Sequence, residues 1–276
     1  MRAILKLCTA TLMWLALTVS MAVAADRARL EAFLEVTGFD VALESIKLAA
    51  GSAPEMLGIS AQDFGSEWLR LSDKVFDVAQ MHDMALDILE ETLSDDMLSH
   101  AATFYASDLG ARLVEAENAS HLHQDEGLKD ESGAALLAAL RQIDSPRVAY
   151  YARMNAASDS AGTSIRALQE IQVRFYLAAA AAGVIQLNMD EGDMRDALAA
   201  GEDELRETIK EGGLEGAAYT YQAFSDAEVL AYAEALEHPV MRQVYDLMNA
   251  VQFEIMANRF EALAQAMADL RPSQEL

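Results

Sequence analysis

The stretch LSDDMLSHAATFYASDLGARLVEAENAS, residues 93–120, returns in altered form as FSDAEVLAYAEALEHPVMRQVYDLMNAV, residues 224–251. Both stretches begin with a serine–aspartate pair and carry an asparagine near the end. The spacing of 131 residues (225 − 94) holds from the first shared position to the last. Most of the residues between these positions differ. A pattern that persists while its residues change is typical of a repeated local fold.

The shared start of the two copies predicts a helix N-terminus. A serine hydroxyl at the N-cap accepts a hydrogen bond from a free amide of the first turn, which suits Ser94 and Ser225. Asp95 and Asp226 then place negative charge where it favours the helix dipole. Apolar residues follow at the i, i+3, i+4 and i+7 positions of one face. In both copies this helix is then expected to end and a second helix to begin. In the second copy the new helix begins at Pro239, since proline is tolerated in the first helical turn. Each copy is therefore expected to form two consecutive helices.

Asn118 and Asn249 are the shared positions that helix formation does not explain. Each lies away from the apolar stripe of its second helix, since nine residues at about 100° per residue bring Asn118 about 180° beyond Leu109. One interpretation is that each asparagine satisfies a backbone group at the end of a neighbouring helix. The alternative is that the asparagines contact a ligand.

The first copy also carries a motif that resembles a known family. The run Phe104-Tyr105-Ala106-Ser107, followed by Gly110, is similar to the motif of the bacterial family called domain of unknown function 2059. That motif has a phenylalanine–tyrosine pair, a serine–proline and a glycine. Asp108 stands where the proline is usual, and the second copy has Pro239 but lacks the aromatic pair and the glycine. The resemblance implies a helical fold and a secreted or periplasmic location in Gram-negative bacteria. It implies no activity and no catalytic residue.

The rest of the chain also has the pattern of helices. Only four prolines occur, strictly alternating strand patterns are absent, and helix-forming residues dominate. We expect an all-α helical bundle of about ten helices with no sheet. Residues 158–164 have the composition of a linker, and shifting residue 25 by the repeat spacing reaches residue 156, just before it. The expected organisation is two similar helical halves, residues 25–157 and 158–276, packed on each other. The glycine pair at residues 212–213 is expected to break a helix.

The N-terminus has the layout of a secretory signal peptide. Arg2 and Lys6 precede a mostly apolar run of about a dozen residues, and small residues follow at positions 22–24. The apolar run is short for a membrane span, which needs about 20 residues. We expect cleavage between Ala24 and Ala25, a periplasmic or secreted product, and no membrane insertion after cleavage. The single cysteine, Cys8, would leave with the signal peptide.

The charge of the chain is strongly acidic. Lysine and arginine number 20 against 45 aspartate and glutamate residues, a formal net charge of −25. Such a surface repels phosphate backbones and anionic lipid head groups, so we expect no nucleic-acid partner. Solubility is one explanation of the charge, and a basic partner or a cation is another.

Candidate sites for chemistry are few. His121, His123 and Asp125 lie close in sequence, but histidines two residues apart point in different directions on a helix, so a metal site is not expected. The acidic run at residues 188–199 lacks the glycine and glutamate positions of a calcium-binding loop. Nucleophile and zinc-protease motifs are absent. We therefore assign no catalytic, cofactor or metal residue.

Three functions remain open at this point. The first is a non-enzymatic structural or interaction protein that binds a protein or peptide partner. The second is a helical binder of a hydrophobic small molecule, for which a cavity between the two halves would be evidence. The third and weakest is a hydrolytic enzyme that uses clustered carboxylates, for which convergent carboxylates with raised pKa values would be evidence.

Overall fold

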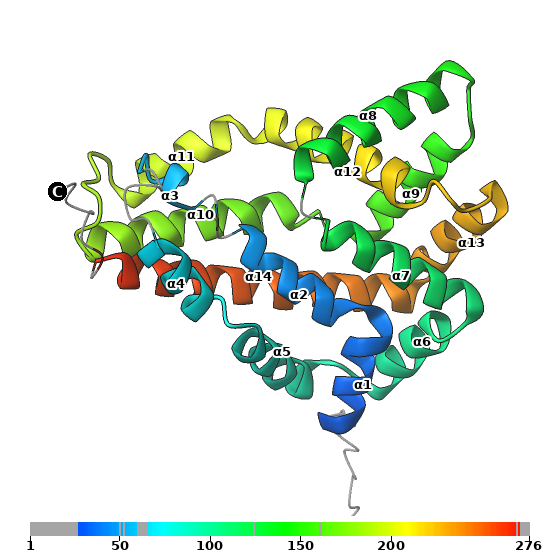
Figure 1. Cartoon of the computed structure of the whole chain (residues 1–276), viewed down its shortest axis with the longest axis horizontal. Helices are drawn as coiled ribbons and strands as arrows, with labels where there is room; N and C mark the ends of the chain where they lie inside the picture. The colour runs from blue at the N-terminus through cyan, green and yellow to red at the C-terminus, as the bar shows by residue number, and fades with distance from the viewer. Residues whose placement is uncertain are drawn as a thin grey trace, which may run out of the picture.

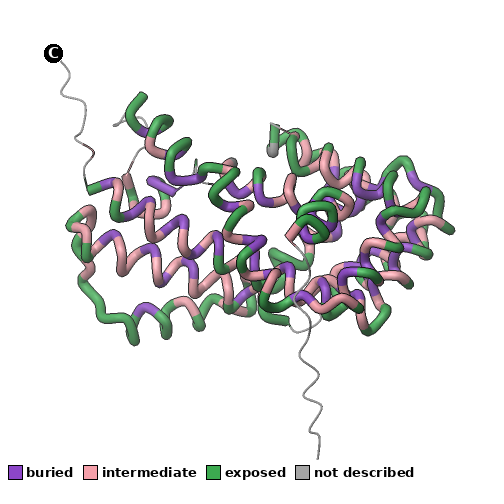
Figure 2. The backbone as a smooth tube through the Cα atoms, turned by 90° about the horizontal axis from the view of Figure 1, so that it is seen from below, coloured by how far each residue is buried: buried purple, intermediate pink, exposed green. Residues whose placement is uncertain are grey.

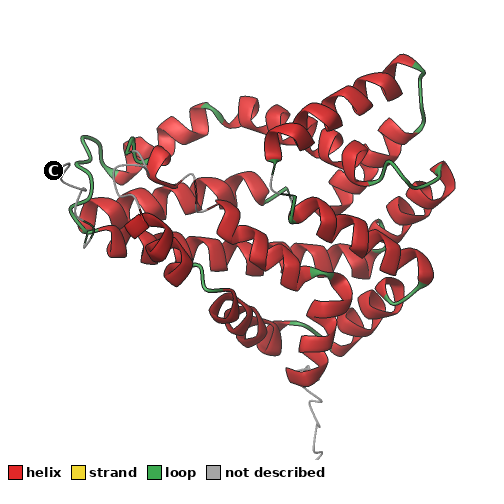
Figure 3. Cartoon of the chain, in the orientation of Figure 1, coloured by secondary structure: helices red, strands yellow, loops and turns green. Residues whose placement is uncertain are grey.

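The chain forms only helices and loops over the part that the computed structural model describes (Figure 3). These described residues are 27–49, 51, 53–59, 66–123, 125–159, 162–268 and 270. The all-α prediction is thus confirmed for them. The predicted signal peptide and its cleavage site lie outside the described residues.

The helices follow one another closely along the chain. Their bounds are α1 Arg27–Thr37, α2 Phe39–Ala49, α3 Ala53–Met56, α4 Ser66–Val75, α5 Val78–Thr92, α6 Asp95–Tyr105, α7 Asp108–His121, α8 Glu126–Gln142, α9 Arg147–Ser158, α10 Ser164–Ala181, α11 Glu191–Ala200, α12 Glu202–Thr220, α13 Asp226–Leu236 and α14 Pro239–Met267. None of these helices is both long enough and apolar enough to cross a membrane.

The longest helix, α14, is the axis of the molecule (Figure 1). Its 29 residues span about 43 Å at 1.5 Å per residue. Helix α10 packs along it, and α4, α5, α6 and α9 contact it as well. Helices α8 and α12 pack against each other along a different edge of the molecule. Because α14 contacts helices from both halves of the chain, its apolar residues join them into one core.

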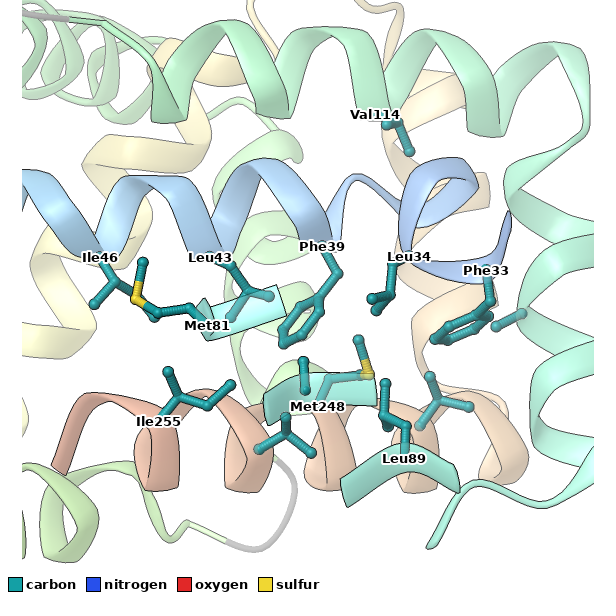
Figure 4. Close-up of a cluster of buried hydrophobic side chains, with 14 of the residues drawn as sticks. Phe33, Leu34, Phe39, Leu43, Ile46, Met81, Leu89, Val114, Met248 and Ile255 are labelled. Atoms are coloured by element: carbon teal, nitrogen blue, oxygen red, sulfur yellow. The ribbon is translucent and has the colours of Figure 1, made fainter. Parts of the chain in front are cut away.

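That core is a single cluster of buried hydrophobic side chains. Figure 4 shows one part of it, where labelled side chains of α1, α2, α5, α7 and α14 meet. Phe260 on α14 holds another part, with its ring edge-on to Phe76 and Phe175 at centroid distances of 5.6 Å and 5.2 Å. Buried and exposed residues alternate around most helices, as amphipathic helices require (Figure 2).

The helix starts predicted in the two copies are confirmed. Ser94 accepts a hydrogen bond from the amide of Met97, and Ser225 accepts one from the amide of Glu228. In the second copy the Glu228 carboxylate also accepts from the Ser225 amide, which completes a capping box. Pro239 occupies the first turn of α14 as expected. Contact with the Ser225 hydroxyl and amide, and with Arg112, holds the pKa of the Glu228 carboxyl down at about 2.

Replacing Ser225 by alanine is expected to lower the free energy of unfolding by about 0.5–2 kcal/mol, since an N-cap bond is lost. Ser94→Ala is expected to cost less, because Ser94 makes its N-cap bond without a reciprocal glutamate. Urea denaturation of the two variants measures both values. Unchanged midpoints for both would contradict the role given to the caps.

One expected break does not occur. Gly212 and Gly213 lie inside α12, which continues from Glu202 to Thr220. Gly213 instead allows α12 to approach α9, because a Cβ there would meet the Asn155 amide nitrogen at 2.5 Å. A glycine pair is typical of a turn, but here its second member allows close helix packing. The predicted break at residues 158–164 is present between α9 and α10.

Candidate functional site

Four tyrosines and one glutamate form a polar cluster where helices α6 and α7 meet the segment that runs from the end of α12 into α14. We call it the tyrosine–glutamate cluster: Tyr105 of α6, Glu117 of α7, Tyr221 after α12, Tyr232 of α13 and Tyr245 of α14. Tyr105 and Glu117 lie more than one hundred residues before the other three members in the sequence. The cluster therefore exists only when the first helix pair, α6–α7, and the second helix pair, α13–α14, come together.

Hydrogen bonds connect all five side chains. The hydroxyls of Tyr221 and Tyr232 both donate to Oε1 of Glu117, at 2.6 Å and 2.8 Å. The hydroxyl oxygens of Tyr232 and Tyr245 are 3.0 Å apart, and those of Tyr105 and Tyr245 are 2.5 Å apart. A phenol has one proton to donate. Since Tyr232 gives its proton to Glu117, it can only accept from its tyrosine neighbours. If Tyr105 donates to Tyr245 and Tyr245 donates to Tyr232, every proton is used and the chain of hydroxyls is polarised toward the carboxylate.

Burial sets the ionisation of the cluster. Desolvation raises the pKa of Glu117, and the bonds from Tyr221 and Tyr232 oppose this rise only in part. Burial also raises the pKa of each of the four tyrosines well above the ordinary value, so they stay protonated and can donate hydrogen bonds. By exposed area Glu117 is only half-buried. Protein atoms nevertheless surround its carboxyl group closely, and Glu117 lines two pockets.

Three pockets adjoin the cluster. The first has a volume of about 170 Å³ and lies between α1, α2, α7 and α14, with Tyr105, Glu117 and Tyr245 in its wall. The second, about 360 Å³, shares Glu117 and Tyr245 with the first and adds side chains of α9 and α12. The third, about 530 Å³, reaches Tyr245 from the side of α9, α10 and α12. Tyr245 is common to all three pockets.

The two shared asparagines lie in the wall of the first pocket. Asn118 packs on Gly38 in the turn between α1 and α2, where a Cβ on the glycine would meet Asn118 Oδ1 at 2.5 Å. Gly38 also has a φ of +71°, which favours glycine. Asn249 donates from Nδ2 to the backbone oxygen of Ser158, at 2.7 Å, at the end of α9. The capping interpretation therefore holds for Asn249, and both asparagines also line a pocket.

The other predicted positions lie outside the pockets. Asp95 pairs with Arg29 of α1 at 2.6 Å, and Asp226 pairs with Arg147 of α9 at 2.5 Å. Phe104 stacks on Tyr232 at a centroid distance of 5.8 Å and so supports the cluster from behind. Remaining members of the predicted set are Ser94, Gly110, Ser225 and Pro239, which form helix starts and the α6–α7 junction.

Sequence reasoning missed most of the cluster. Tyr232 is buried on the inner face of α13, but the apolar pattern of the sequence does not show which group its hydroxyl contacts. Glu117 resembled one of many surface acids. The available signal was that buried tyrosine hydroxyls need hydrogen-bond partners. The sequence does not say which acid supplies that partner.

The residues considered as metal ligands, His121, His123 and Asp125, lie between the end of α7 and the start of α8. His123 Nδ1 lies 3.1 Å from the backbone oxygen of Asp125, and its ring meets Tyr219 edge-on at 6.0 Å. Among the described residues, no group of three or more histidine, cysteine or acidic side chains is arranged to hold a metal ion. In the acidic run near residue 190, Asp190 accepts from the amide of Asp193 and caps α11.

The raised pKa of Glu117 predicts a specific pH dependence of stability. The folded state holds this proton more tightly than the unfolded state does, whose pKa is near the ordinary 4.5. As the pH rises from 4.5 through the folded-state pKa, the wild type therefore loses stability relative to Glu117→Gln, which cannot titrate. Above the folded-state pKa, the difference in the free energy of unfolding between the two proteins no longer changes with pH. Urea denaturation of both proteins across the pH range measures it, and parallel curves would contradict the assignment.

Together the fold and the cluster define an all-α protein with a polar, tyrosine-lined junction between two helix pairs. Residues 79–137 match the model of a family described as an uncharacterized protein conserved in bacteria, DUF2059. The resemblance seen in the first copy is thus confirmed, over a stretch that holds α6, α7 and parts of α5 and α8. It includes Tyr105, Glu117 and Asn118. Neither the curated proteins nor the solved structures yield a match.

Proposed function

We propose that this chain is a non-enzymatic helical protein that binds a small molecule between its two helix pairs. The observation that carries the proposal is the convergence of three pockets, of about 170, 360 and 530 Å³, on Tyr245 at the tyrosine–glutamate cluster. Small-molecule sites are typically concave, largely apolar, and supplied with a few converging polar groups. The first pocket has this make-up, with Phe33, Phe39 and Met248 beside Glu117 and Asn249.

The first pocket also bears on the hydrolytic alternative. Hydrolysis by carboxylates uses two of them at a defined separation. Among the described residues that line the first pocket, Glu117 is the only acid. Its two hydrogen-bond donors are tyrosines whose pKa values burial raises, so they are poor proton donors to a substrate at neutral pH. This favours binding over catalysis.

A protein partner is the second candidate, and one surface feature favours it. Leu69 and Leu122 are 65% and 45% exposed, and both line a shallow pocket with Trp68. Exposed apolar side chains that gather in one place are typical of interaction surfaces. If this surface binds a partner, Leu69→Glu should abolish capture of that partner and leave small-molecule binding intact.

Periplasmic or secreted location remains part of the proposal. Residues 1–24 have the three parts of a signal peptide. Mass spectrometry of the protein recovered from the periplasm should give a chain that begins at Ala25. Recovery of the intact chain from the cytoplasm alone would contradict this location.

We also propose that the two helix pairs derive from an internal duplication. Three of their four helix starts and ends per pair coincide under the shift of 131 residues: α6 Asp95–Tyr105 becomes α13 Asp226–Leu236, and both second helices begin three residues later. The second helices differ at their ends, since α7 ends at His121 whereas α14 continues to Met267. Asp95 pairs with an arginine of α1, and its counterpart Asp226 pairs with an arginine of α9. The surrounding contacts correspond in part. Helix α1 contacts α6 as α9 contacts α13, α2 contacts α7 as α10 contacts α14, and α5 contacts α1 and α2 as α12 contacts α9 and α10.

The binding proposal is tested by ligand retention. Protein recovered from the periplasm is examined by native mass spectrometry, and any released compound is identified after unfolding. Ala42 lines the first pocket, so Ala42→Phe adds a ring there and should remove the retained mass. Ala119→Phe places the same ring on the exposed face of α7 and should keep it. Retention by Ala42→Phe, or no retained mass in the wild type even after addition of small apolar compounds, would contradict the proposal.

A further inference from the structure

We infer that the ligand of the first pocket carries a protonated amine, and that Glu117 is its counter-ion. This inference rests on the proposed binding function and names the chemical class of the ligand. Four features of the pocket support it: the charge of Glu117, the direction of its hydrogen bonds, the acceptor groups nearby, and the position of the cationic residues.

The first feature is an acid for which the described residues provide no lysine or arginine partner, with His121 as the basic side chain in the same pocket wall. The pKa of Glu117 responds to desolvation and to the two tyrosine hydroxyls, and no lysine or arginine contributes to it. The first pocket has no lysine or arginine in its wall among the described residues. An ionised carboxylate taken out of water is costly unless it is paired. An ammonium group that enters the pocket would supply the missing charge.

The second feature is that Glu117 retains a free acceptor direction. Tyr221 and Tyr232 both donate to the same oxygen, Oε1. Oε2 is not used by these bonds, and Glu117 lines both the first and the second pocket. The tyrosines therefore fix the orientation of the carboxylate and leave its second oxygen for a ligand that donates a proton. An ammonium is such a donor.

The third feature is the distribution of acceptors and aromatic faces. Asn249 donates a hydrogen bond from Nδ2 to the Ser158 backbone oxygen, which leaves its Oδ1 as an acceptor at the pocket. Tyr105 and Tyr245 add electron-rich rings, which attract cations. Phe33 and Phe39 line the same pocket and suit an apolar group attached to the amine. The volume of about 170 Å³ is close to the roughly 150 Å³ of a cavity known to hold benzene.

The fourth feature separates the first pocket from its neighbours. Lys129 lines the second pocket, and Arg206 and Lys210 line the third. Each of these side chains would repel an ammonium. The acidic surface of the whole chain also raises the local concentration of cations over that of anions. The first pocket is therefore the one that suits an amine.

Calorimetric titration with two matched probes tests the inference. Phenethylamine and phenethyl alcohol share the ring and the chain and differ in the charged end. At neutral pH the wild type should bind the amine more tightly than the alcohol by about tenfold or more, as a hydrogen bond to a charged group is worth about 1.5–3 kcal/mol. Glu117→Gln keeps a carbonyl oxygen for the two tyrosines. It should lose this preference and bind the alcohol as the wild type does.

Glu115→Gln is the control, because it removes the same charge from the exposed face of α7 and should keep the preference. Thermal unfolding of all three proteins verifies that each is folded. Equal affinity of the wild type for amine and alcohol, or an unchanged preference in Glu117→Gln, would overturn the amine assignment and leave the binding function standing. Binding of neither probe to the wild type would contradict both.

Discussion

Gly110→Ala is expected to lower the free energy of unfolding by at least about 1–3 kcal/mol, the usual cost of forcing extra volume into a packed site. Gly110 lies in the first turn of α7, directly against the end of α6. A Cβ there would lie 2.2 Å from the backbone oxygen of Phe104 and 2.6 Å from the Cα of Tyr105. Both obstacles are backbone atoms, so a side-chain rotation cannot relieve the clash. The α6–α7 junction would have to open, which would displace Tyr105 from the cluster.

Gly212→Ala is the matched control for this prediction. Gly212 lies inside α12, and a Cβ there would meet nothing within 4 Å. Alanine is a better helix former than glycine by about 0.8–1.0 kcal/mol, so this variant should be more stable than the wild type. Urea denaturation of the two variants should give shifts of opposite sign. A Gly110→Ala protein as stable as the wild type would show that the junction is less tight than the structure indicates.

Glu117→Leu is the second change with a large expected effect. It removes the acceptor of the Tyr221 and Tyr232 hydroxyls while it keeps the bulk of the side chain. A buried donor left without an acceptor costs about 1–3 kcal/mol. Tyr232 retains contacts with Tyr105 and Tyr245, so we expect the loss of the Tyr221 bond to dominate. Thermal and urea unfolding at neutral pH measure the cost.

Glu117→Gln provides the comparison for Glu117→Leu. Its amide oxygen can accept both tyrosine protons, and it has no charge to bury. At neutral pH it should be at least as stable as the wild type, and well above Glu117→Leu. If leucine and glutamine gave the same stability, the hydroxyls would not depend on this acceptor, and the cluster would not be the polar network described.

The local signals of the sequence predicted the helices well. Ser94 and Ser225 begin helices because a cap depends on residues within three positions of it. The resemblance to a bacterial family also depended on a short local run of residues. The glycine of that run, Gly110, is required because it packs against the backbone of the preceding turn. Such features can be read from the sequence because the interacting groups are close along the chain.

The tyrosine–glutamate cluster could not be read in that way. Tyr105 and Tyr245 are 140 residues apart in sequence, and their contact depends on how the two helix pairs dock. Glu117 is one of 45 acidic residues, and only its burial distinguishes it. Gly213 is a second case in which the local sequence was insufficient. A glycine pair predicts a turn, but Gly213 lies inside a helix and packs closely against Asn155, a contact that depends on the tertiary fold. Asn118 and Asn249 were the positions that local reasoning left unexplained, and both line the first pocket.

The central claim is that the first pocket admits a ligand next to Glu117. Methionine methyl NMR tests this directly, because Met248 is buried and lines the first pocket, whereas Met194 is buried in α11 away from it. During titration with phenethylamine, the Met248 methyl resonance, identified with Met248→Leu, should shift and saturate, and that of Met194 should stay in place. A Met248 resonance that does not move while the protein is saturated with phenethylamine, or no response at any methyl, would contradict the account.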